Sequence, residues 1–121
     1  TMKHRVEIVH HPEDAPNVQT SAAGRFRVEW YRPALKYCSI RTNKPWDITN
    51  ASTVSYFEVN IEQCSDAIGI GLTADNYELK DKMPGWSEDS IGVHSDDGKL
   101  FVDAGIARDF TNPFNNKGAV V

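Results

Sequence analysis

The chain has no apolar run that approaches the roughly 20 residues with which a helix crosses a bilayer. Positive charge is not in excess either. The formal net charge is -4 at pH 7, whereas a general nucleic-acid binder needs a basic face to meet phosphates. No charged and then apolar leader is visible at the N-terminus. We therefore expect neither a membrane nor a nucleic acid as partner. We expect a cytoplasmic location, with the nucleus, or secretion after loss of a leader, as the alternatives.

Residues arranged for chemistry are scarce as well. No serine stands in a nucleophile elbow, and no glycine-rich phosphate loop is present. The run at 96–98 (Asp-Asp-Gly) lacks the further ligands of a calcium loop and predicts a hairpin turn. The pair at 10–11 (His-His), close to Glu13 and Asp14, has side chains that suit zinc. Adjacent histidines at the end of a strand point in different directions, however. We expect no catalytic site, no metal and no cofactor.

Cysteine is limited to Cys38 and Cys64 in 121 residues. Both stand in strand-like contexts. This favours two buried thiols in a reducing compartment, and a disulfide between them is the alternative.

Helical periodicity is absent, because no segment repeats apolar residues at spacings of three and four over the length of a helix. Short alternating segments separated by Gly, Pro, Asn and Asp instead predict an all-β, antiparallel sandwich or barrel. The Asp-Gly step at 97–98 supplies the positive φ of a hairpin turn. The expected strands are 3–9, 26–31, 37–42, 56–62, 67–72, 91–94 and 99–102, and the tail from Ala119 looks like the start of another. Within 56–62 the apolar residues Phe57, Val59 and Ile61 alternate with more polar ones, so they are expected to face the core.

Four motifs follow one another in the second half of the chain. They are Tyr-Phe-Glu-Val at 56–59, Ile-Gly-Ile-Gly-Leu at 68–72, Pro-Gly-Trp at 84–86 and Gly-x-His-x-Asp-Asp-Gly-x-x-Phe at 92–101. In order and approximate spacing they resemble the SPRY (B30.2-like) domain family, and most of all its Ran-binding-protein-M type. The resemblance covers residues 39–121 and extends more weakly over 3–38. Within the motifs we expect His94 to make a structural hydrogen bond and Trp86 to be a packing residue.

The resemblance implies a single domain over residues 1–121 with the antiparallel β-sandwich of the SPRY and concanavalin-like jelly rolls. The family has further strands beyond the point matched by 118–121 (Gly-Ala-Val-Val), where this sequence ends. A sandwich without these strands exposes apolar faces and unpaired edges. We therefore expect a fold that is incomplete at the C-terminus and completed by a second chain, or by a homodimer, for example through strand swapping.

SPRY domains are non-catalytic modules that hold a peptide of a partner protein with loops at one end of the sandwich. The resemblance implies the same function here, as an adaptor or substrate receptor in a ubiquitin-ligase or scaffold complex. Two loops carry aromatic and basic residues of the kind found in binding hot spots, and Tyr77 matches the tyrosine of a family binding loop. The candidate partner-binding residues are Arg41, Lys44, Pro45, Trp46, Tyr77, Glu78, Leu79, Lys80 and Met83.

Two other functions are open. A lectin-like sandwich that binds or hydrolyses carbohydrate would need paired carboxylates in a groove, and the sequence gives no sign that any two acids lie opposite each other. A half-domain whose role is assembly by dimerisation would form a concentration-dependent dimer. The acids that could serve the first alternative are Glu58, Glu62, Asp66 and Asp75.

Overall fold

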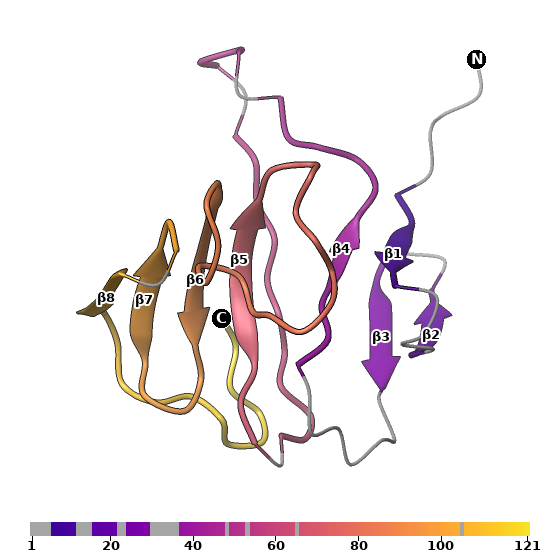
Figure 1. The fold of residues 1–121 in the computed structure, drawn as a ribbon. Coiled ribbons are helices and arrows are strands. Elements are labelled where there is room, and N and C mark those ends of the chain that lie inside the picture. The colour runs from indigo at the N-terminus through magenta and orange to yellow at the C-terminus, as the bar shows by residue number, and fades with distance from the viewer. Residues whose placement is uncertain are drawn as a thin grey trace, which may run out of the picture.

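The computed structural model describes residues 6–11, 16–21, 24–29, 37–47, 49–52, 54–64, 66–104 and 106–121. These residues form eight strands and no helix (Figure 1). Every strand pair is antiparallel. The prediction of an all-β, antiparallel fold is therefore confirmed, and the arrangement is consistent with a β-sandwich.

The strands group into three sheets. Two are two-stranded and one has four strands in the order β5-β6-β7-β8. The pairs are β1 (Ile8–His10) with β4 (Ile40–Thr42) and β2 (Asn17–Thr20) with β3 (Phe26–Glu29), and the larger sheet holds β5 (Gly69–Thr73), β6 (Ser90–His94), β7 (Lys99–Val102) and β8 (Ile106–Asp109).

The hairpin of β6 and β7 forms where the sequence predicts it. Gly98 has φ +67°, and its N–H donates to the carbonyl oxygen of His94 at 2.9 Å. The turn thus uses the left-handed conformation that glycine adopts without steric cost. The expected strands at 26–31 and 37–42 are confirmed in part, as β3 and β4, while Trp30 and Tyr31 lie outside the described residues.

The expected strand at 56–62 is wrong as a regular strand. Only Asn60 forms a bridge, opposite Val120. Ile61 is 2% exposed, as expected of a residue that faces the core. Phe57, on the same predicted face, is 43% exposed, and Tyr56, on the opposite face, is 75% exposed. Alternation therefore predicts the burial of Ile61 correctly and that of Phe57 wrongly.

The C-terminal segment pairs within the chain. The N–H of Val59 donates to Val121 at 2.8 Å, and the N–H of Val121 donates back to Val59 at 2.9 Å. Ile61 donates to Ala119 at 2.8 Å and accepts from Gly118 at 2.7 Å. This short antiparallel ladder gives the tail a partner in the same chain. The expectation of a homodimer or second chain is not tested by a single chain and stays a prediction.

One face of the four-stranded sheet is lined by glycines, and the loop that precedes β6 packs on it. A Cβ atom at Gly92 would lie 2.5 Å from the carbonyl oxygen of Pro84, and one at Gly69 would lie 2.8 Å from Cε of Met83. Glycine at these positions lets the loop approach the strands closely. The Nε2 atom of His94, a buried residue, lies 2.9 Å from the same Pro84 oxygen, so the predicted structural hydrogen bond of this histidine is confirmed.

Aromatic rings complete the packing on this face. The rings of His94 and Phe101 are stacked with centroids 4.1 Å apart. Trp86 packs edge-on against His94 at 5.4 Å and against Tyr37 at 5.0 Å. Trp86 is 36% exposed, but its ring is held by these neighbours, which confirms its predicted packing role.

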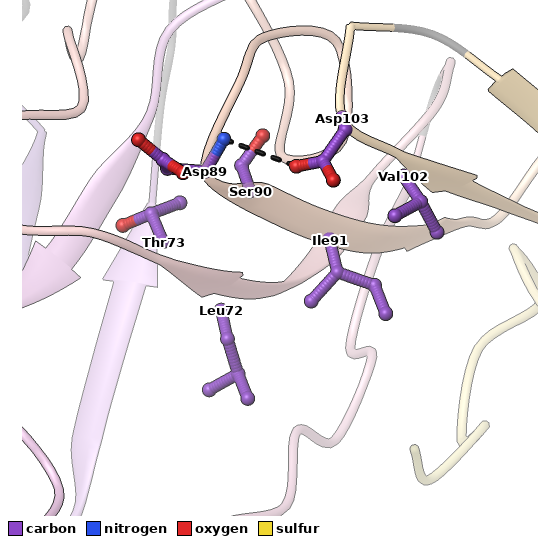
Figure 2. Close-up of a pocket in the computed structure, with 7 residues that line it drawn as sticks. All are labelled: Leu72, Thr73, Asp89, Ser90, Ile91, Val102 and Asp103. Atoms are coloured by element: carbon purple, nitrogen blue, oxygen red, sulfur yellow. Dashed lines mark hydrogen bonds between the residues drawn. The ribbon is translucent and has the colours of Figure 1, made fainter.

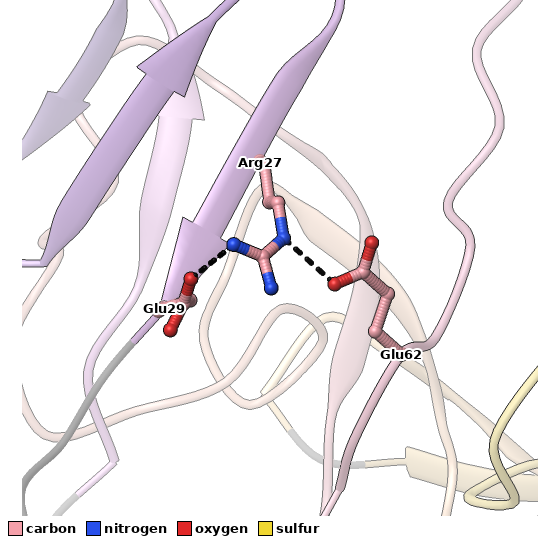
Figure 3. Close-up of polar contacts among 3 residues, drawn as sticks. All are labelled: Arg27, Glu29 and Glu62. Carbon is pink, nitrogen blue, oxygen red and sulfur yellow. Dashed lines mark hydrogen bonds and ion pairs between the residues drawn. The ribbon is translucent and has the colours of Figure 1, made fainter.

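An ion-pair cluster links β3 to the segment that precedes β5. The Nε atom of Arg27 lies 2.8 Å from Glu62, and the same guanidinium group pairs with Glu29 (Figure 3). Arg27 and Glu62 are both more than half exposed, so the cluster fixes the relative position of two segments without a large gain in stability. Glu62, a candidate acid of the carbohydrate alternative, is therefore engaged in a structural contact.

Candidate partner-binding surface

The loop after β5 is attached to the segment at 37–39, which leads into β4. Cys38 bridges Lys80 in an antiparallel sense. Ser39 donates its N–H to Leu79 at 3.1 Å, and Asp81 donates to Tyr37 at 2.9 Å. In Figure 1 this loop arches from the end of β5 past β4. The structure therefore brings the second group of predicted binding residues (Tyr77, Glu78, Leu79, Lys80 and Met83) next to β4. This strand carries Arg41 and precedes the first group (Lys44, Pro45 and Trp46).

Tyr77 lies inside this arrangement. Its side chain is 7% exposed, and Nζ of Lys82 sits 5.3 Å from the centre of its ring. No described residue meets the geometry of a hydrogen bond to its hydroxyl. Burial raises the pKa of Tyr77, and the neighbouring Ser39 hydroxyl opposes part of the rise. A direct contact between Tyr77 and a partner would require the loop to move, so its binding role stays a prediction.

Arg41 is half-buried at the centre of β4. One terminal N–H donates to the carbonyl oxygen of Asp75, while Nε is buried and has no hydrogen-bond partner among the described residues. Asp75 precedes Tyr77 by two residues, so Arg41 fastens the start of the same loop. The guanidinium group therefore holds a loop and also has unused capacity as a donor.

The other members of the second group differ in exposure. Met83 is 5% exposed and packs against Gly69. Leu79 and Lys80 are half-buried, and their backbone makes the ladder to 37–39. Glu78 is exposed and lies 3.7 Å from Lys82. Of these four residues, Glu78 offers the most accessible side chain to a partner.

The first group of predicted binding residues lies on the loop after β4. Lys44, Pro45 and Trp46 are all exposed. Trp46 is 38% exposed, and its ring lies 5.6 Å from that of Phe57, which is 43% exposed. The sequence predicts Trp46 as a binding residue but not Phe57, because alternation assigns Phe57 to the core. We call Lys44, Pro45, Trp46 and Phe57 the aromatic patch.

Hydrogen bonds on both sides hold the loop of the aromatic patch in shape. Before it, Asn43 exchanges two hydrogen bonds with Glu7, of 2.8 and 2.9 Å. After it, Asp47 accepts from the hydroxyl and the backbone N–H of Thr49, and these bonds lower the pKa of Asp47. Such side-chain to backbone bonds define local turns. The exposed rings are therefore presented by a loop with a defined conformation.

A second apolar surface was not predicted from the sequence. Leu72, Ile91 and Val102 project from the same side of the four-stranded sheet and line a shallow hollow (Figure 2). At its rim the N–H of Asp89 donates to Asp103 at 3.1 Å. The signal for this surface is the register between strands, which a linear sequence does not contain.

Other site classes find little support in the described part of the chain. It holds no group of three or more His, Cys, Asp and Glu residues that could bind a metal ion, although Glu13 and Asp14 lie outside it. Cys38 and Cys64 are half-buried and form no disulfide. Over the same residues, no helix has the length and apolar character needed to span a membrane.

Comparison with known proteins finds relatives among the Ran-binding proteins and the SPRY domain-containing proteins. The chain is 36% identical over 78 residues to the Ran-binding proteins 9/10 homolog of Drosophila melanogaster, which is 63% of this chain and 8% of the relative. It is 35% identical over 108 residues to Ran-binding protein 9 of Xenopus tropicalis, or 85% of this chain and 19% of the relative. It is 42% identical over 59 residues to SPRY domain-containing protein 3 of Homo sapiens, which is 46% of this chain and 13% of the relative. No family model and no solved structure matches.

These matches span a small part of each relative, so the chain corresponds to one region of much longer proteins. The fold is an antiparallel β-structure in which loops between the strands carry the candidate binding residues. Together with the matches, this fold supports a SPRY-like domain, as the motifs predict.

Proposed function

We propose that this chain is a non-catalytic protein-interaction module. It binds a peptide segment of a partner protein with the loops after β4 and β5. The observation that carries the proposal is the aromatic patch, in which two partly exposed rings contact each other beside Lys44. Aromatic side chains on a preformed loop lose little conformational entropy on binding, which is why such residues supply much of the binding energy in interfaces.

The proposed binding residues also include Arg41 on β4 and, on the loop after β5, Tyr77, Glu78, Leu79, Lys80 and Met83. Of these, Glu78 is exposed, whereas Tyr77 and Met83 are buried and would contact a partner only if the loop moved. The names of two of the relatives describe proteins that bind Ran. Those relatives support protein binding as the function class, and the identity of the partner is left to experiment. An adaptor or substrate-receptor role in a ubiquitin-ligase or scaffold complex, in the cytoplasm, is the finer form of the same proposal.

A selection of random peptides displayed on phage tests the proposal. Peptides selected on the wild-type chain should bind Trp46→Ala at least about tenfold more weakly, since truncation of a hot-spot aromatic costs that much or more. Val54→Ala is the matched control, because Val54 is 90% exposed on the neighbouring segment. If the selected peptides bind both variants as tightly as the wild type, the aromatic patch is not the binding site.

A further inference from the structure

A row of aliphatic side chains crosses all four strands of the large sheet. Leu72 is paired with Ile91, Ile91 with Val102, and Val102 with Ile106. Paired residues in an antiparallel sheet lie on the same face, so the four side chains form one continuous line. Leu72 is 44%, Ile91 37% and Ile106 64% exposed. The exposure is therefore greatest at the β8 end of the row.

The next row on this face ends differently. Ile70 is paired with Val93, Val93 with Leu100, and Leu100 with Arg108. Arg108 is exposed, and its guanidinium group forms no ion pair or side-chain hydrogen bond with any described residue. On β8 the face therefore presents one aliphatic side chain and, two residues further, one unpaired cation.

β8 is also the outermost strand of its sheet (Figure 1). All four of its residues are exposed, and no strand of the described chain pairs with its outer side. An edge strand offers a row of backbone N–H and carbonyl groups to any extended segment that lies beside it. Proteins use such edges to bind peptides by adding a strand.

We propose that β8 binds an extended segment of a partner protein, which continues the sheet as a fifth strand. The partner places an apolar side chain opposite Ile106 and a carboxylate opposite Arg108. The opposite face of β8 carries Ala107 and Asp109, so the partner has a small residue and a cation there. The outer edge of β8 is separate from the aromatic patch, and it would bind the partner through backbone hydrogen bonds rather than through loop side chains.

A second copy of the chain fits this edge less well. Antiparallel self-pairing centred on Ala107 places Arg108 beside Ile106 of the second copy, where it meets no carboxylate. Self-pairing centred on Arg108 places two guanidinium groups opposite each other, which is repulsive. The charge pattern of β8 therefore favours a partner segment of different sequence.

The test uses the isotope-labelled chain and two short synthetic peptides. The first contains Val-Lys-Glu-Thr-Val between threonines, which in antiparallel register places its glutamate opposite Arg108 and its lysine opposite Asp109. The second exchanges the lysine and the glutamate, so that like charges meet at both positions. We expect the first peptide to shift the amide resonances of 106–109 and to bind roughly tenfold more tightly than the second.

Two further probes separate strand addition from side-chain docking. Alternate N–H groups of an extended peptide point to the same side, so N-methylation of one alternate set blocks one edge of the peptide. Of two peptides methylated on complementary sets, one should lose binding and the other should retain it. In Arg108→Glu the preference for the first peptide over the second should disappear.

Several results would overturn the proposal. The first is that no resonance of 106–109 shifts at millimolar peptide. The others are equal binding of the charge-exchanged peptides, and equal binding of the two methylated peptides. A homodimer that the Arg108→Glu substitution disrupts or strengthens would show that the occupant of the edge is a second copy.

Discussion

At the scale of single residues, Tyr77 shows where motif matching and structure differ. The resemblance assigns it to a binding loop, whereas the structure leaves only 7% of its side chain exposed. Tyr77 is buried because its loop is bonded to a segment 38 residues earlier in the chain, where the N–H of Ser39 donates to the carbonyl oxygen of Leu79. A motif identifies the loop but not the strand on which it packs, so the exposure of a loop aromatic could not be predicted.

The first prediction concerns the pH dependence of stability. The unfolded chain ionises Tyr77 near its ordinary pKa of 10.0, whereas burial raises the pKa in the folded state. Above that pH the unfolded state therefore binds fewer protons than the folded state, and stability falls as pH rises. In Tyr77→Phe this part of the loss should disappear. At neutral pH the variant should be as stable as the wild type, or more stable by up to about 1 kcal/mol, because the hydroxyl that is removed is buried and meets no described residue with hydrogen-bond geometry.

Urea denaturation at neutral pH and at about pH 10.5 measures both effects. Tyr37→Phe serves as the control, since Tyr37 is 38% exposed. A Tyr77→Phe variant that is destabilised at neutral pH would show that the hydroxyl has a partner in solution. A variant that loses stability with pH as steeply as the control would contradict the role of burial.

At the scale of elements, the sequence predicts strands best where local chemistry determines them. The β6–β7 hairpin has alternating apolar residues and an Asp-Gly turn, and both appear in the structure. β8 was not predicted because its four residues are all exposed, so it has no buried face to generate an alternating pattern. β2 was missed for a similar reason, since Val18 is its only half-buried residue.

The second prediction concerns the glycines beneath the loop at 83–86. Gly92→Ala would bring a Cβ within 2.5 Å of a backbone oxygen of Pro84, which cannot move without displacing the loop. Gly69→Ala would meet first the flexible end of Met83, at 2.8 Å. We expect Gly92→Ala to cost about 2 kcal/mol or more and Gly69→Ala clearly less, as measured by chemical denaturation. The reverse order would mean that the loop, rather than Met83, is the part that yields.

At the scale of the whole molecule, the position of the tail and of the segment at 54–64 could not be predicted. The sequence indicates a strand beginning near Ala119, and the resemblance suggests that another chain lies beside it. In the structure its partner is the short stretch from Val59 to Ile61. Pairing between segments some 60 positions apart leaves no local pattern, because each side contributes only a few residues. The aromatic patch could not be predicted for the same reason, since Trp46 and Phe57 come from separate segments.

The third prediction separates the predicted role of Phe57 from its observed one. Ile61 is 2% exposed and its backbone pairs with the tail, whereas Phe57 is 43% exposed and contacts Trp46. Ile61→Ala should therefore cost about 2–5 kcal/mol of unfolding free energy, and Phe57→Ala about 1 kcal/mol or less. Hydrogen exchange adds a local readout, because the amide of Val121 should exchange faster in Ile61→Ala and remain unchanged in Phe57→Ala. A Phe57→Ala variant destabilised as strongly as Ile61→Ala would place both side chains in one core, as simple alternation predicts, and would remove Phe57 from the proposed binding surface.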